Sequence, residues 1–162
     1  IERATRLAKA AGMRHIKLYV IVGLPDETAE DLDELVQLVR RLSKILPVVL
    51  GVSPFVPKFR TPLADAPFAG RKAVTKALRY LQRGLKGRGE LRGPGAREAF
   101  IEYRLAQGGF RHAEAAIRAA HDDASLGAWI RALKEMPEKV RPERFDEWVP
   151  APTKRRLPVV RL

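Results

Sequence analysis

The sequence predicts an α/β fold in which a strand-helix-strand unit is followed by a small group of helices. Two short runs of apolar, β-branched residues flank one long amphipathic segment, which is the order of a βαβ unit. Beyond residue 69 the apolar residues recur at helical spacing in several shorter segments. A length of 162 residues with 46% hydrophobic residues suits one compact domain, or part of a larger one.

The first predicted element is a helix from Glu2 to Ala11 that ends at Gly12. Glycine readily adopts the left-handed conformation that closes many helices. The chain starts with Ile1 rather than Met, and IERATRLAKAAG has the pattern of the middle and end of an amphipathic helix. We therefore expect the chain to be the C-terminal fragment of a longer protein.

The second and third elements are a strand and a long helix. The run IKLYVIV, residues 16 to 22, is too apolar for a strand with one wet face, so we expect a buried strand of a parallel sheet. Thr28 is a suitable N-cap for the helix, with Asp31 completing an imperfect capping box. The apolar residues that follow at helical spacing are Leu32, Leu35, Val36, Val39, Leu42 and Leu46.

A second strand, Val48 to Val52, completes the unit and is closed by Ser53-Pro54. The strands of a βαβ unit are parallel, so the loops Gly23-Leu24-Pro25 and Ser53-Pro54-Phe55 are expected at the same edge of the sheet. Ligands of such sheets bind outside the carboxyl ends of the strands. Gly23 would let a ligand approach the backbone, although a plain turn between strand and helix is the alternative.

The rest of the chain is predicted to be mainly helical. The expected helices are Gly70 to Lys86, Ala96 to Gln107, Arg111 to Ala120 and Leu126 to Leu133, with a short extended piece at Glu90 to Arg92. Five prolines make the segment from Pro137 to Leu162 an irregular tail. We divide the chain into residues 1–68, a helical extension at 69–135 and a Pro-rich tail at 136–162.

Composition excludes several kinds of site. The chain has no cysteine, so it cannot form a disulfide, a thiolate zinc site or a cysteine-ligated iron-sulfur cluster by itself. His121 beside Asp122-Asp123 is the nearest approach to a metal site, and a solvent-facing helix end is the favoured interpretation. No apolar run approaches the roughly 20 residues of a membrane span, and no signal peptide is visible, so we expect a cytoplasmic protein without a membrane partner.

The net charge of +12 comes from 31 Lys and Arg against 19 Asp and Glu. Such an excess attracts phosphate backbones. The bases are scattered along the predicted helices, and they are dense only at Lys86-Gly87-Arg88 and Lys154-Arg155-Arg156. A solvated basic surface is therefore the expected interpretation, and a basic RNA-binding or ribosome-binding module is the alternative function.

Three segments resemble a known family. KLYVIVGLPDETAEDLDELVQLV and GVSPFVPKFRTPLADAP are similar to the fifth and sixth strands of the TIM-like barrel of radical S-adenosylmethionine (radical SAM) enzymes, in the group that often carries a cobalamin-binding domain. GPGAREAFIEYRLAQGGFRHAEAAIRAAHDDASLGAWIRAL resembles the helical extension of that group. The resemblance covers residues 1 to 135 and implies that residues 1–68 are the C-terminal portion of a barrel.

The resemblance also implies a set of cofactor-binding residues. The adenine-contacting pattern Gly-x-Ile-x-Gly-x-x-Glu of the family matches this sequence at Ile21 and Gly23, and departs from it at Tyr19 and Asp26. Glu27 stands beside Asp26, so either acid could take the glutamate position. At the end of the second strand, the residues implied to offer backbone groups and an apolar wall to the adenine are Val52, Ser53, Pro54 and Phe55.

The cofactors implied are S-adenosylmethionine and a four-iron four-sulfur (4Fe-4S) cluster, and the resemblance also allows cobalamin. The family holds its cluster with three cysteines spaced Cys-x-x-x-Cys-x-x-Cys, which this chain lacks. The implied partners are the N-terminal part of the same polypeptide, a reductant such as flavodoxin or ferredoxin, and an unknown substrate. The implied reaction is methyl transfer, methylthiolation or rearrangement. We assign no catalytic residue and no metal ligand to this chain, and expect it to be inactive alone.

Overall fold

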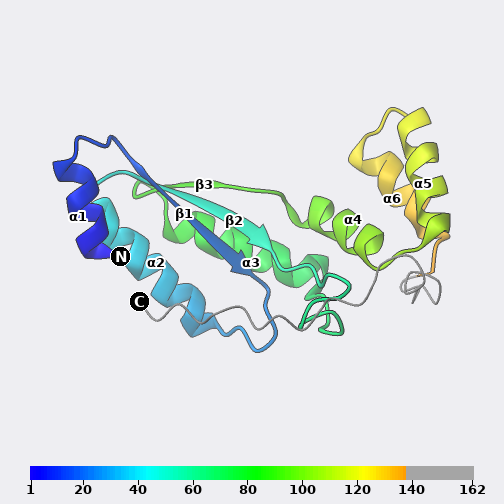
Figure 1. The fold of residues 1–162 in the computed structure, drawn as a ribbon, viewed down its shortest axis with the longest axis horizontal. Coiled ribbons are helices and arrows are strands. Elements are labelled where there is room, and N and C mark those ends of the chain that lie inside the picture. The colour runs from blue at the N-terminus through cyan, green and yellow to red at the C-terminus, as the bar shows by residue number, and fades with distance from the viewer. Residues whose placement is uncertain (138–162) are drawn as a thin grey trace, which may run out of the picture.

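A computed structural model of the chain describes residues 1–137, apart from the side chains of Phe110 and Arg111. The elements are α1 (Glu2–Ala10), β1 (Ile16–Val22), α2 (Ala29–Ser43), β2 (Val48–Pro54), α3 (Gly70–Gly84), β3 (Glu90–Arg92), α4 (Ala96–Ala106), α5 (Phe110–His121) and α6 (Leu126–Lys134). The predicted Pro-rich tail lies outside the described residues beyond Pro137, as does the cluster Lys154-Arg155-Arg156. Figure 1 shows α5 and α6 at the opposite end of the molecule from α1.

The described residues contain one sheet of three parallel strands in the order β1-β2-β3. The β1-β2 register runs from Ile16 opposite Val48 to Val22 opposite Pro54. The predicted α/β class and the predicted βαβ unit are therefore confirmed. The second strand is two residues longer than predicted, because Ser53 and Pro54 stay in register with β1.

The core lies between one face of this sheet and two helices, α2 and α3. Side chains of a strand alternate between its faces, so every second residue of β1 and β2 contributes to this core. The buried members of the core are Val22, Val36, Val39, Leu42, Val48, Leu50, Val52, Leu81 and Leu85. The α3 helix ends at Gly84, two residues before the predicted end at Lys86, and Leu85 still packs into the core.

The opposite face of the sheet is open, which corrects the expectation that β1 is buried on both faces. Tyr19 is 76% exposed and Ile21 is 53% exposed. Both core helices lie on the other side of the sheet, and β1 is an edge strand among residues 1–137. The prediction of a strand at residues 16 to 22 is therefore confirmed, but the prediction that both of its faces are buried is wrong.

The sheet continues beyond the first βαβ unit. β3 pairs with β2 in parallel, with Leu50 opposite Leu91, and Leu91 packs against the core. The predicted extended piece at Glu90 to Arg92 is thus confirmed as a strand. The boundary that we placed after residue 68 falls inside this packed layer, because α3 and β3 complete a second βαβ unit.

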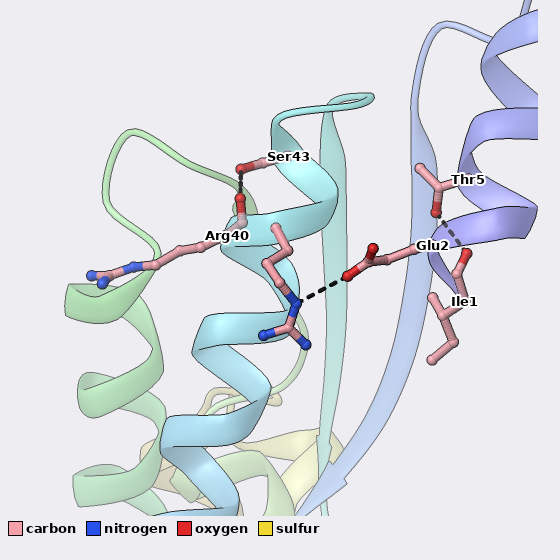
Figure 2. A network of polar contacts seen from close by, with 6 residues as sticks. Ile1, Glu2, Thr5, Arg40 and Ser43 are labelled. Carbon is pink, nitrogen blue, oxygen red and sulfur yellow. Dashed lines mark hydrogen bonds and ion pairs between the residues drawn. The ribbon is translucent and has the colours of Figure 1, made fainter.

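The first helix ends as its glycine predicts. Gly12 has φ +81°, and its N–H donates to the carbonyl of Lys9 at 3.0 Å, while the N–H of Met13 donates to that of Ala8 at 3.0 Å. These two bonds form a Schellman motif. Figure 2 shows Glu2 of α1 directed at α2, where its carboxylate pairs with the guanidinium of Arg41 at 3.0 Å.

The predicted capping box of α2 is present in full. The N–H of Asp31 donates to the Thr28 hydroxyl at 3.3 Å, and the N–H of Thr28 donates to the Asp31 carboxylate at 2.8 Å. The hydroxyl of Thr28 also donates to this carboxylate, at 2.9 Å, and the two bonds that the carboxylate accepts, from the N–H first and from the hydroxyl, lower the pKa of Asp31 below its ordinary value. The start of the helix is therefore fixed by two side chains.

The helices α4, α5 and α6 form a second, smaller core around Ile101, Ala115, Leu133 and Met136. The segment after β2 packs against α4: the Gln107 amide donates to the Pro57 carbonyl at 2.8 Å, and the Phe68 and Tyr103 rings stack at 4.7 Å. The ends of the three helices lie within one residue of their predicted bounds. None of the helices within residues 1–137 combines the length and apolarity that crossing a membrane requires.

Two buried polar residues stabilise this helical core. Nη2 of Arg104 donates to the carbonyls of Leu133 at 2.8 Å and Met136 at 2.6 Å, at the end of α6. His112 is 2% exposed, accepts the N–H of Gly109 at Nδ1 and meets the Pro137 carbonyl at 3.1 Å through Nε2. The two contacts of His112 fit a neutral ring with its proton on Nε2.

A candidate cofactor pocket at the carboxyl ends of β1 and β2

A pocket of about 500 Å³ lies where β1 and β2 end. It is lined by Ile21, Ser53, Pro54, Phe55, Val56, Lys58, Thr61, Pro62, Leu63, Pro94 and Glu102. Ile21, Ser53, Pro54 and Phe55 are four of the six residues that the resemblance named as cofactor-binding. The structure thus brings together most of the predicted site at the predicted edge of the sheet.

Strand register explains why two of these side chains meet. Ile21 pairs with Ser53, and both project from the open face of the sheet. The N–H of Phe55 donates to the carbonyl of Val22 at 2.7 Å, which extends the strand pairing by one step beyond β2. That bond positions the Phe55 side chain, which is 8% exposed, at the wall of the pocket.

Two predicted site residues lie elsewhere. The side chain of Val52 is 1% exposed and belongs to the core between the sheet and the helices. Gly23 does not line the pocket, because the position of its missing Cβ faces Ala69, whose Cβ would be 3.3 Å away, and Val74. The Val52 side chain and the Cβ position of Gly23 therefore face the protein interior, so only the backbone groups of these two residues could contact a ligand.

The turn after β1 is stabilised by a carboxylate whose role the sequence left open. Oε1 of Glu27 accepts the N–H of Gly23 at 2.9 Å, and the N–H of Glu27 donates to the Leu24 carbonyl at 3.2 Å. Gly23 has φ +78°, and Asp26 has φ +62°. Of the two neighbouring acids, Glu27 closes the turn, and Asp26 occupies its left-handed corner.

The polar side of the pocket is an ion pair that the sequence did not reveal. The Lys58 ammonium pairs with the Glu102 carboxylate of α4, and both side chains are about half exposed. These residues are 44 positions apart, so no local pattern could have connected them. The helix α4 of the helical extension therefore supplies part of the wall of the pocket.

The arrangement is suited to binding a flat, largely apolar group. Its walls are mainly aliphatic and aromatic, and its polar groups are few: the Ser53 and Thr61 hydroxyls and the Lys58–Glu102 pair. Within residues 1–137, no three His, Asp or Glu side chains gather where they could hold a metal ion. Beside His121, Asp122 pairs with Arg131 at 2.6 Å and Asp123 accepts the N–H of Ser125 at 2.9 Å.

Comparison with known proteins found a partial relative. Over 90 residues the chain is 37% identical to an uncharacterized protein of the archaeon Methanocaldococcus jannaschii, a match that covers 55% of this chain and 20% of that protein. The chain therefore spans about a fifth of the length of the curated relative that it matches. No protein-family model and no solved structure matches the chain.

Proposed function

We propose that the chain supplies part of the adenosine pocket of a radical S-adenosylmethionine enzyme, as the C-terminal portion of its barrel with the helical extension attached. One observation carries the proposal: Ile21, Ser53, Pro54 and Phe55, which the family resemblance names, line one pocket at the carboxyl edge of a parallel sheet. Ligands of parallel α/β sheets bind at this edge.

The size of the pocket supports the proposal that it binds the adenosine part of the cofactor. Its volume of about 500 Å³ lies within the range of about 300 to 1,000 Å³ that is typical of small-molecule sites. Ile21 and Phe55 would contact the faces of the adenine ring, and the backbone at Ser53 and Pro54 would meet its polar edge. The Lys58–Glu102 pair would hold α4 over the site and limit the entry of water.

The iron-sulfur cluster does not fit this chain alone. The chain contains no cysteine and therefore offers no thiolate ligand. The cofactor's role in the parent enzyme would be to generate a carbon-centred radical for methyl transfer, methylthiolation or rearrangement. The residues of this chain would bind the adenosine and orient it, while cluster ligation would fall to another part of the polypeptide.

The covering of the sheet on one face supports the proposal that it is part of a barrel. Helices cover one of its faces, while the other face, which would be the interior of a barrel, exposes Tyr19 and Ile21. β1 and β3 are its edges among residues 1–137, so strands from the rest of the parent polypeptide could pair with either. The greater length of the archaeal relative leaves ample chain for those strands.

Titration calorimetry of S-adenosylmethionine with the full-length parent tests the proposal. Phe55→Ala should weaken binding at least tenfold, a change of about 1.4 kcal/mol, because it removes an apolar wall of the pocket. The matched control is Phe59→Ala, since Phe59 is 45% exposed and does not line the pocket. A folded Phe55→Ala protein that binds the cofactor as tightly as the parent would refute the assignment.

The gene provides an independent test. Reading the DNA upstream of the codon for Ile1 should reveal three cysteines spaced Cys-x-x-x-Cys-x-x-Cys in the same reading frame. An upstream segment without them would remove the ligands that the proposed chemistry requires.

A further inference from the structure

A second surface, separate from the pocket, is made of cations. A groove of about 490 Å³ between α3 and α4 is lined by Arg71, Lys72, Lys76, Arg79, Arg83 and Arg97, together with Thr75 and Ala96. None of these eight lining residues is acidic or aromatic. We refer to the six cations as the basic groove.

The α3 helix explains how scattered bases become one stripe. Lys72, Lys76, Arg79 and Arg83 follow one another at intervals of four, three and four residues, which places them on one side of a helix. The buried residues of α3, Val74, Ala77 and Leu81, lie on the side that meets the core. The stripe therefore faces solvent, and it extends for about 16 Å along the helix at about 1.5 Å per residue.

The charges of the basic groove are not neutralised within residues 1–137. The ion pairs found there belong to other cations, among them Arg41, Arg92 and Arg131. Arg71 lies over the Phe100 ring at 4.9 Å, and Nε of Arg83 donates to the Arg79 carbonyl at 3.3 Å, but neither contact removes a positive charge. Six like charges in one groove repel each other, and a bound polyanion would relieve that repulsion.

We propose that the basic groove binds the phosphate backbone of a nucleic-acid duplex without reading its sequence. A stripe of about 16 Å spans the rise of about five base pairs of a duplex, at about 3.4 Å per pair, so its cations can reach several phosphates on the duplex surface. Phosphate contacts of this kind position a protein but do not specify bases. The proposal is independent of the cofactor pocket.

Two other polyanions fit the groove less well. Binding of single strands relies on aromatic side chains that stack on bases, and none of the described lining residues is aromatic. Binding at a membrane surface relies on apolar side chains beside the cations, and the only apolar lining residue here is Ala96. A duplex holds its phosphates at regular, fixed positions, and phosphate contacts need neither aromatic nor apolar side chains.

The test is a fluorescence-anisotropy titration of the full chain with a labelled 16-base-pair RNA duplex. The variant Lys76→Gln/Arg79→Gln/Arg83→Gln removes three charges from the stripe. The matched control Arg3→Gln/Arg6→Gln/Lys9→Gln removes three exposed charges from α1, so both proteins have a formal net charge of +9, which is +12 less three. Circular dichroism checks that both variants keep their helices.

The groove variant should bind the duplex at least tenfold more weakly than the unmodified chain at 50 mM salt, while the control should stay within about threefold. In a plot of log affinity against log salt concentration, the slope for the groove variant should be smaller in magnitude by about three than the slope for the unmodified chain. Each lost phosphate contact reduces this slope by about one. Equal losses in both variants would show that binding follows net charge, which overturns the proposal. It is also overturned if the unmodified chain binds anionic phosphatidylglycerol vesicles or single-stranded RNA more tightly than the duplex, or binds no duplex.

Discussion

The backbone N–H of Gly23 and the carboxylate of Glu27 are joined by a hydrogen bond of 2.9 Å that closes the turn between β1 and α2. Glu27→Ala removes the acceptor and should lower the free energy of unfolding by about 1.5 kcal/mol, the lower end of values for bonds to charged groups, because the site is only partly buried. Glu27→Gln retains an acceptor oxygen, so its free energy of unfolding should fall less than that of Glu27→Ala. Urea unfolding measures both, and the exposed Glu34→Ala is the control; an equal loss in Glu34→Ala would contradict the role of Glu27.

Alanine substitutions at Gly23 and Gly12 can separate the cost of backbone strain from the cost of steric contact with a neighbouring side chain. Both have positive φ, +78° and +81°, but a Cβ on Gly12 meets nothing within 4 Å, whereas one on Gly23 would be 3.3 Å from the Ala69 Cβ. Gly12→Ala should cost about 1 to 2 kcal/mol of stability from strain alone. Gly23→Ala should cost more, as measured by denaturant unfolding. Equal costs would mean that Ala69 moves aside freely.

Arg104 is predicted to hold the end of α6 in place. Arg104→Met leaves the carbonyls of Leu133 and Met136 without this buried donor and should destabilise the helical core by about 2 to 3 kcal/mol. Hydrogen exchange of α6 amides should accelerate, while the core of the sheet changes little. The control is Arg97→Met on the exposed side of α4, and similar exchange in the two variants would exclude the proposed role.

His112 should make the helical core sensitive to acid. Burial lowers the pKa of His112 below its ordinary 6.5, and Arg104 adds to this, while the bond to Pro137 opposes it. The unfolded chain therefore takes up a proton at this residue before the folded chain does, so the stability is complete above pH 6.5 and falls as the pH drops toward the folded pKa.

The measurement is urea unfolding followed by tryptophan fluorescence at pH 7.5, 6.5 and 5.5. His112→Gln removes the titrating ring, so its loss of stability between these pH values should be smaller than that of the unmodified chain. Parallel pH profiles for the two proteins would show that other groups account for the acid sensitivity.

The parts of the fold that could be predicted are those encoded by neighbouring residues. The capping box of Thr28 and Asp31, the glycine at position 12 and the apolar period of α2 each act within a few residues, and the structure contains all three. The pocket at the carboxyl edge followed from a single rule, since parallel strands end on the same side. The resemblance then supplied Ile21 and Phe55.

The parts that could not be predicted depend on pairing across the chain. An apolar sequence such as that of β1 is compatible with a strand whose two faces are both buried and with one that is buried on a single face. The exposure of Tyr19 therefore could not be predicted from the sequence of the strand. The Lys58–Glu102 pair and the contacts of Arg104 with the carbonyls of Leu133 and Met136 join residues that are far apart in sequence. The stripe on α3 is different, because its bases recur at intervals of four, three and four residues within one predicted helix and are therefore encoded locally.

Among residues 1–137, β1 is an edge strand, which has a consequence for the behaviour of the chain at high concentration. An edge strand offers unpaired backbone donors and acceptors to any other strand, and the exposed Tyr19 and Ile21 add apolar surface on the adjoining face. Lys17 opposes pairing at this edge, because two copies that pair through β1 bring their lysine charges together, and these charges repel each other. The ammonium of Lys17 lies 4.8 Å from the centre of the Tyr19 ring. Replacing Lys17 with Gln should therefore lower the concentration at which light scattering detects oligomers.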